Sequence, residues 1–118
     1  MKYMLLIYGT DQAWDEAGRE ECYAESIELA NELKAQGKFV ATAPLHSSTT
    51  ATSLRVRDGK RVITDGPFAE TREYLGGYFL VDVKDLDEAM DIAARIPGGR
   101  VGTVEIRPVI ELPNFPQV

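Results

Sequence analysis

The segment TDGPFAETREYLGG, residues 64–77, concentrates side chains that can do chemistry. Asp65, Glu70 and Glu73 supply three carboxylates, the group that proteins use as a general acid or base. Arg72 adds a guanidinium that can bind an anionic substrate group or pair with a neighbouring glutamate. The segment therefore indicates either the rim of an active site or a shaped turn whose carboxylates only bind backbone N–H groups.

The shape of the segment can also be predicted. Pro67 favours an extended Gly66, and Phe68 is a candidate for a buried anchor. Thr71-Arg72-Glu73 is a candidate for a short helical turn that puts Glu70 and Glu73 on the same side.

The only histidine of the chain, His46, lies in a polar link after a predicted strand. Histidine titrates near neutral pH and is a common general base when a carboxylate orients it. If this link and residues 64–77 meet at one end of a sheet, His46 can act as the base and Asp65 can orient it. The alternative is that His46 is a loop residue with no role in chemistry.

Metal and cofactor chemistry has little support in the sequence. Cys22 and His46 are the only cysteine and histidine, which excludes a site built from Cys and His ligands. No GxGxxG or phosphate-binding loop is present, so we expect no cofactor. A divalent-cation site made only of Asp65, Glu70 and Glu73 remains open as a weaker alternative.

Length and charge limit the class of protein. The chain has 118 residues, which suits a single domain over residues 1–118. Its net charge of −6 disfavours binding to nucleic acid and to anionic membranes. The apolar start, MKYMLLIYGT, is far shorter than the roughly 20 residues that span a bilayer, so it predicts a strand and a cytoplasmic protein.

Two helices are predicted between strand-like segments. Over residues 19–36, one apolar stripe has helical spacing and Gly37 follows as the expected C′ residue. The members of this stripe are Tyr23, Ile27, Ala30 and Leu33. A second helix begins after Asp85, which can cap its N-terminus, and ends before Pro97.

The remaining pattern predicts strands. Strands are expected at residues 2–8, 38–45, 77–83 and 103–110, and residues 52–64 form a hairpin. The hairpin turn is Asp58-Gly59, a dipeptide preferred in type I′ turns. The tail, about residues 111–118, carries two prolines and is expected to be extended.

This order, β-α-β-β-β-α-β, indicates an α+β ferredoxin-like fold with an antiparallel sheet and both helices on one side. The runs MLLIY and YFLVDV are apolar at both odd and even positions, so side chains on both faces of the sheet favour burial. We therefore expect a homodimer that packs sheet on sheet, while the alternative is a hairpin or loop folded over the open face.

The run DGPFAETREYLGGYFLVDVKDLDEAMDIAARIP resembles the signature of the YCII-related proteins, in the subgroup named for its DGPF motif. The resemblance extends from MKYMLLIYG through TATSLRVRDGKRVITDGPFAET to VEIRPV. It implies a bacterial protein with a dimeric α+β barrel. It also implies acid/base chemistry without a cofactor, because one relative eliminates chloride from a chlorinated hydroxyquinol. Subgroup members are often encoded beside extracytoplasmic-function sigma factors, which implies a regulatory alternative.

The resemblance also ranks the candidate residues. The family proposes a His–Asp pair, in which the aspartate corresponds to Asp65 and the histidine position falls near Ser26 on the first helix. The expected catalytic residues are Asp65 and His46, and those that bind substrate are Ser26, Tyr23, Glu70 and Arg72. The first functional hypothesis is a small enzyme of lyase (dehydrochlorinase) or hydrolase type, or a small-molecule-binding protein. The second is a non-catalytic module that docks on a protein partner.

Overall fold

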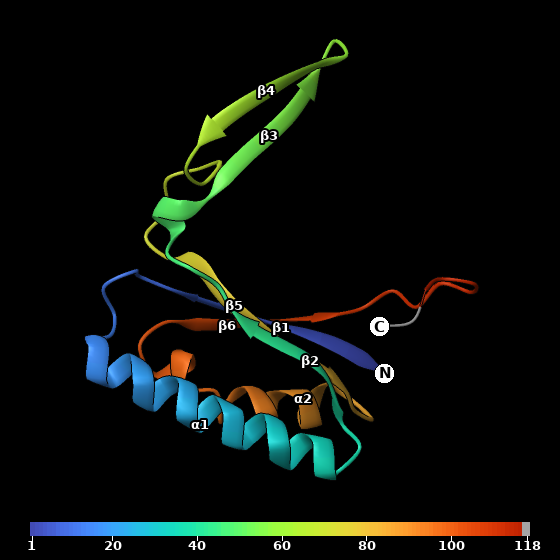
Figure 1. Cartoon of the computed structure of the whole chain (residues 1–118). Coiled ribbons are helices and arrows are strands. Elements are labelled where there is room, and N and C mark those ends of the chain that lie inside the picture. Colours follow the sequence, from blue (N-terminus) through green and yellow to red (C-terminus); the bar gives the residue numbers. More distant parts are fainter. Residues whose placement is uncertain (117–118) are drawn as a thin grey trace.

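Four antiparallel strands form the main sheet, in the order β2-β5-β1-β6. Their bounds are β1 (Lys2–Gly9), β2 (Phe39–Pro44), β5 (Tyr74–Asp82) and β6 (Thr103–Pro108). The helices α1 (Glu16–Ala35) and α2 (Leu86–Ala93) lie together on one face of this sheet (Figure 1). This computed structural model describes residues 1–116, and it confirms a mixed α+β protein with antiparallel sheets and two helices.

The predicted hairpin forms a second sheet of its own. Strands β3 (Thr52–Arg57) and β4 (Lys60–Asp65) pair only with each other. Asp58 and Gly59 have φ angles of 51° and 74°, as the predicted type I′ turn requires. The hairpin follows the short 3₁₀ helix η1 (Ser48–Thr50) and projects from the main sheet on the side opposite the helices (Figure 1). We refer to residues 52–65 as the arm.

The core lies between the main sheet and the two helices. Alternate residues of β1 point into it, with Tyr3 at 5% and Leu5 at 0% exposure, as the period of two in a strand requires. The largest side chains that are fully buried come from both layers: Phe79, Leu5, Leu29, Leu33, Ile96, Val81 and Pro97. No polar or charged residue is buried among the described residues, so packing of apolar side chains holds this layer together.

Helix α1 begins three residues earlier than predicted, because the Asp15 carboxylate accepts a hydrogen bond from the Gly18 N–H at 2.7 Å and caps it. Its buried face also differs from the predicted stripe. Leu29 and Leu33 are buried, but Tyr23 and Ile27 are 41% and 61% exposed. The prediction was wrong for Tyr23 and Ile27. The face of the helix that packs on the sheet is rotated by about one residue from the predicted stripe.

Two ion pairs lie on one flank of α1. Glu25 pairs with Arg100 and Glu32 pairs with Arg95, which joins the helix to the turn after α2 and to the 3₁₀ helix η2 (Pro97–Arg100). Tyr23 and Ile27 lie on the other flank, since they are two positions before and after Glu25, which is about 160° around a helix. We refer to Tyr23 and Ile27 as the α1 flank.

Helix α2 begins as predicted, since the Asp85 carboxylate accepts a hydrogen bond from the Glu88 N–H at 3.0 Å. Gly37, with φ of 73°, confirms the expected left-handed residue after α1. Within residues 1–116, no helix has the length and apolar character needed to cross a membrane.

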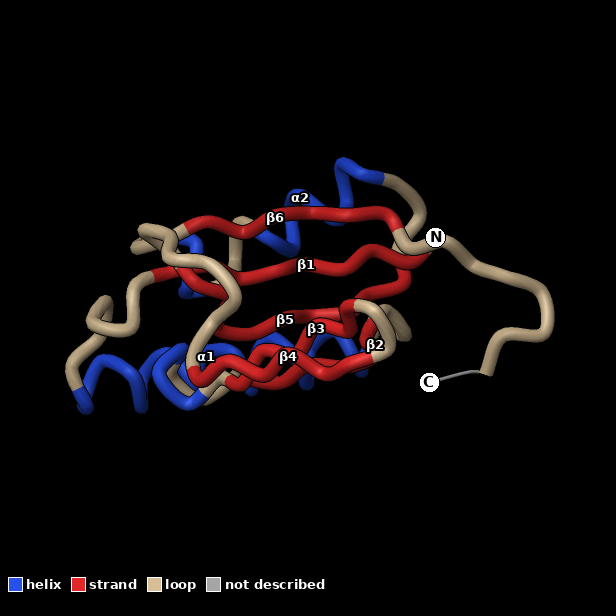
Figure 2. The backbone as a smooth tube through the Cα atoms, turned by 90° about the horizontal axis from the view of Figure 1, so that it is seen from above, coloured by secondary structure: helices blue, strands red, loops and turns tan. Residues whose placement is uncertain are grey.

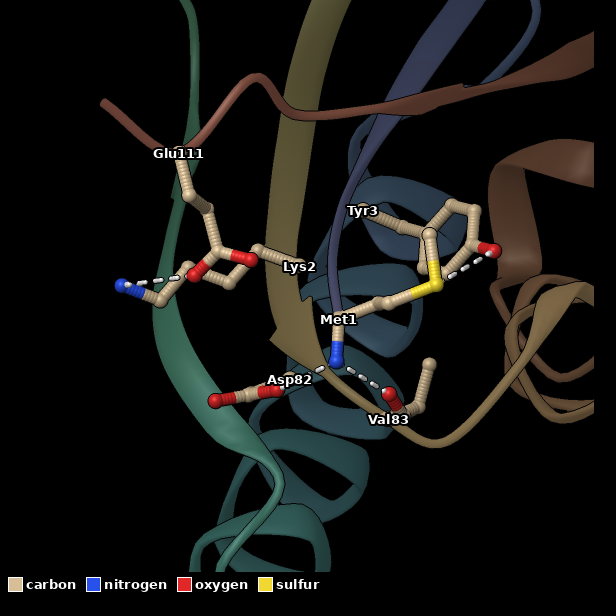
Figure 3. A network of polar contacts seen from close by, with 6 residues as sticks. All are labelled: Met1, Lys2, Tyr3, Asp82, Val83 and Glu111. Atoms are coloured by element: carbon tan, nitrogen blue, oxygen red, sulfur yellow. Dashed lines mark hydrogen bonds and ion pairs between the residues drawn. The ribbon is translucent and has the colours of Figure 1, made fainter. Parts of the chain in front are cut away.

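The far end of the sheet is held by polar contacts of the first residues (Figure 3). The amino group of Met1 donates to the Asp82 carboxylate at 3.2 Å and to the Val83 carbonyl at 2.7 Å. Lys2 lies 4.0 Å from the Glu111 carboxylate, which brings the start of the tail beside β1. Residues 111–116 belong to no helix or strand, and the last two residues of the predicted tail lie outside the described range.

The other face of the main sheet carries no helix of the described chain (Figures 1 and 2). Residues paired across antiparallel strands share a face, so Met4 lies beside Leu80, and Leu6 lies beside Tyr78. Ala41 continues the row at the β2 edge, opposite Leu80. The centre of this open face is therefore apolar.

The molecule is extended for its size. Its radius of gyration is 15.9 Å, against about 13.5 Å expected for a compact domain of this length. Its accessible surface is 8538 Å², against about 6,400 Å² for a folded monomer of this mass. The projecting arm contributes to this excess, since all but one of the residues of β3 and β4 are exposed.

Candidate functional site

Most of the predicted site residues lie at one end of the main sheet. Because neighbouring strands are antiparallel, β1 and β2 end where β5 and β6 begin. The connections that gather there are residues 10–15, 45–51, 66–73 and 101–102. We refer to these four connections as the loop end, and the arm also departs from it (Figure 1).

A carboxylate outside the predicted set joins two of these connections. Asp11 follows β1 and accepts hydrogen bonds from both the backbone N–H, at 3.2 Å, and the hydroxyl of Ser48. These bonds, first the one from the Ser48 hydroxyl, lower the pKa of Asp11 below its ordinary value of 3.8. The sequence signal for this residue was an acidic side chain directly after a central strand.

We expect Asp11→Ala to destabilise the protein in a pH-dependent way. Because the pKa of Asp11 is lower in the folded than in the unfolded state, its carboxylate stabilises the fold at every pH above the unfolded pKa. This stabilisation is lost as the pH falls through the pKa of the folded state. The melting temperature of Asp11→Ala should therefore lie below that of wild type at pH 7, and the gap should close by about pH 2. Because Asp11 is exposed, the gap should be a few degrees.

The control for this experiment is Ser48→Ala, which removes the hydroxyl donor but keeps the carboxylate. Ser48→Ala should show part of the same pH-dependent loss in melting temperature. Adding Asp11→Ala to this variant should lower the melting temperature by less than it does in wild type. A gap between Asp11→Ala and wild type that persists unchanged at pH 2 would show that the carboxylate charge is not responsible.

His46 belongs to the loop end and Asp65 ends the arm next to it, but their side chains do not touch. His46 is exposed and lies two residues before Ser48, in the link that Asp11 holds. Asp65 is the last residue of β4, opposite Thr52, and its side chain is exposed. Among residues 1–116, no hydrogen bond or ion pair joins the two side chains. In a single subunit, Asp65 therefore does not orient His46.

The turn after Asp65 differs from the expected shape in two ways. Gly66 has a φ of 101°, where an ordinary extended conformation was expected, because its N–H donates to the Ala51 carbonyl at 2.7 Å. Its carbonyl accepts from the Ser53 hydroxyl at 2.8 Å. Phe68 was predicted as a buried anchor, but it is 78% exposed. That prediction was wrong for the isolated chain, since the arm stands away from the core.

Residues 70–73 do not form the short helical turn that their spacing suggested. The Thr71 hydroxyl donates to the Glu73 carbonyl at 2.5 Å, and the Glu73 carboxylate accepts from the Thr103 hydroxyl at 2.9 Å. Glu73 thus ties the start of β5 to the start of β6. Glu70 and Arg72 are exposed, and in the described range the expected ion pair of Arg72 with a neighbouring glutamate is absent.

The two predicted residues of α1 differ in their surroundings. Ser26 is half-buried beside Cys22; burial raises the pKa of the Cys22 thiol, and the Ser26 hydroxyl bond offsets part of this rise. Tyr23 lies on the exposed α1 flank. Within residues 1–116 no group of three or more acidic, His or Cys side chains could hold a metal ion.

An antiparallel four-stranded sheet, with two helices on one face and a loop end rich in carboxylates, defines a small α+β protein whose second sheet face carries no helix within residues 1–116. The chain belongs to the YCII-related domain family, which matches residues 1–113. It is 33% identical over 114 residues to an uncharacterized protein of Rhizobium meliloti (strain 1021), and the match covers 92% of each chain.

Proposed function

We propose that this YCII-related protein is a homodimer that binds or transforms a small organic molecule at its loop end. The observation that carries the proposal is that His46, Asp11 and Glu73 lie on connections at one end of the sheet, where Asp65 also ends the arm. Binding and catalytic residues often lie on loops held by a rigid scaffold, and a few polar groups there give a small-molecule site its specificity.

The strand order supports the ferredoxin-like part of the proposal. Each helix connects two parallel strands that are separated by a third, as in β1-α1-β2 and β5-α2-β6, and the resulting order is β2-β5-β1-β6. The arm is inserted between the two halves. Together with the TDGPF segment at residues 64–68, this arrangement is what we expect of the DGPF subgroup.

The open sheet face supports the dimer. Met4, Leu6, Tyr78 and Leu80 form an apolar row that no helix of the described chain covers. The surface exceeds that of a typical monomer by about 2,100 Å², which is more than the roughly 800 Å² that each partner buries in a standard interface. Two such faces packed together would form the dimeric α+β barrel.

The proposed chemistry is acid/base catalysis of lyase or hydrolase type. His46 is the base, Asp65 orients it or the substrate, and Arg72 binds an anionic substrate group. Glu70, Ser26 and Tyr23 line the path to the site. Because His46 and Asp65 do not touch in one subunit, substrate binding or the second subunit has to bring them together.

The second candidate function is a non-catalytic docking module. The 78% exposure of Phe68 favours it, since an exposed aromatic side chain on a shaped turn is a common anchor for a protein partner. The net charge of −6 suits a basic partner protein better than nucleic acid.

A thermal-shift screen with small phenols and organic acids tests the first candidate. We expect at least one compound class to raise the melting temperature of wild type, and His46→Ala and Asp65→Asn to reduce that shift by more than half. Both side chains are exposed, so neither substitution should lower the melting temperature without ligand by more than a few degrees.

The matched control is Asp91→Asn, which removes one exposed carboxylate from α2, away from the loop end. It should keep the full ligand-dependent shift. Equal shifts in wild type, His46→Ala and Asp65→Asn would contradict the assignment of the site. The docking module would be favoured if no small molecule raised the melting temperature but a basic protein did. The increase caused by the basic protein should then be absent in Phe68→Ala.

A further inference from the structure

The arm has two distinct faces. Leu54 lies opposite Ile63, and Val56 lies opposite Arg61, so these residues share one face. Leu54, Val56 and Ile63 are 53%, 58% and 59% exposed. We refer to these three residues as the aliphatic face of the arm. A two-stranded hairpin that exposes such a face is marginally stable by itself, which indicates that another surface covers it.

The arm is basic in an acidic protein. It contains four basic residues and two acidic ones, giving a net charge of +2 for residues 52–65. The whole chain carries −6, so the rest of the chain carries −8. The basic residues are Arg55, Arg57, Lys60 and Arg61. Within residues 1–116 none of them forms an ion pair, so their charge is available to another surface.

The start of α1 offers the opposite charge next to an apolar surface. Tyr23 and Ile27, the α1 flank, are exposed on the side away from α2. Acidic residues crowd the first turns of the same helix, and in the described range none of them pairs with a cation: Glu16, Glu20 and Glu21. The aliphatic face of the arm, which also carries Arg61, therefore has a complementary surface in the same sequence.

The arm cannot reach this surface in its own subunit, because it stands on the opposite side of the main sheet from the helices (Figure 1). A second subunit packed on the open face brings its own α1 within reach. Stacked sheets lie about 10 Å apart, and a helix axis lies about another 10 Å beyond its sheet. Six-residue strands such as β3 and β4 extend about 20 Å, which matches this distance.

We propose that the arm crosses to the second subunit of the dimer, packs its aliphatic face on the partner's α1 flank, and places Arg61, which lies on that same face, beside the acidic first turns of that helix. The inference rests on the proposed dimer and adds how the two copies hold each other. Because Asp65 ends β4 and Tyr23 belongs to the α1 flank, the exchange places residues of both subunits around each candidate site.

Cross-linking between two different single-cysteine chains tests the exchange. One chain carries Cys22→Ser and Val56→Cys, and the other, distinguished by a tag, carries Cys22→Ser and Ile27→Cys. After mixing and re-equilibration, a short bismaleimide should join the tagged and untagged chains. Val56 and Ile27 are both exposed, so each substitution leaves the core intact.

The control partner is a chain with Cys22→Ser and Ala94→Cys, since Ala94 is exposed at the end of α2, in the groove beside Glu28 on the side of α1 away from the α1 flank. We expect at least tenfold more cross-linked heterodimer with Ile27→Cys than with Ala94→Cys. Equal yields from a protein that light scattering shows to be dimeric would overturn the arm exchange alone. A monomer by light scattering would overturn both the exchange and the proposed dimer.

Discussion

Gly102→Ala is expected to lower the free energy of unfolding by about 3 kcal/mol or more, which corresponds to a loss of more than about 10 °C in melting temperature. A methyl group at this position would lie 2.0 Å from the Tyr8 carbonyl oxygen and 3.1 Å from the Gly9 Cα. Both neighbours are backbone atoms of the β1 end, so no side-chain rotation relieves the clash. The strands β1 and β6 would have to separate at the loop end.

Gly9→Ala is the matched control for this substitution. Gly9 lies beside Gly102, but a methyl group there would meet no atom within 4 Å, and its φ is not positive. We expect its melting temperature to stay within a few degrees of wild type or to rise slightly, because alanine restricts the unfolded chain. Equal losses in Gly9→Ala and Gly102→Ala by differential scanning calorimetry would show that loop-end flexibility, and not close packing, is the cause.

Leu6→Asp is expected to weaken the dimer at least about 30-fold, because a charge at the centre of an apolar interface loses its hydration without gaining a partner. Leu6 lies between Tyr78 of β5 and Glu105 of β6 on the open face. Size-exclusion chromatography with light scattering over a dilution series would show the shift to monomer. Circular dichroism would show whether the helices persist in the monomer.

Met90→Asp provides the comparison, since it replaces an apolar residue that is 44% exposed on α2, on the helix side of the sheet. It should leave the dimer unchanged at the same protein concentrations. A Leu6→Asp protein that stays dimeric, or a wild-type protein that is already monomeric at micromolar concentration, would contradict packing through the open face.

Local signals in the sequence were enough to predict the regular elements. Asp58-Gly59 placed the hairpin turn, Asp85 placed the start of α2, and Gly37 placed the end of α1. Each of these residues acts through its own backbone or the next turn, so no distant contact is needed to interpret it. The apolar runs of β1 and β5 similarly predicted the two central strands of the sheet.

The predictions that failed depended on distant parts of the chain. The face of α1 that is buried packs in a core with Phe79 and Ile96, which follow the helix by more than 40 residues, so the spacing within α1 could not separate Tyr23 from that face. Phe68 was expected to be buried because aromatic side chains usually are, yet the direction of the arm leaves it exposed. Asp11 gains its significance only from Ser48, 37 positions later.

The central position of β1 also affects how the protein is made. This strand leaves the ribosome before its partners β5 and β6, and residue Tyr3 pairs with Val81 and Pro108. At about 5–20 residues per second, synthesis of the roughly 100 residues in between takes about 5–20 s. During that time an apolar strand with two unpaired edges is exposed to aggregation. Nascent chains of this protein should therefore depend on chaperones for β1 more than for the arm, whose two strands are adjacent in sequence.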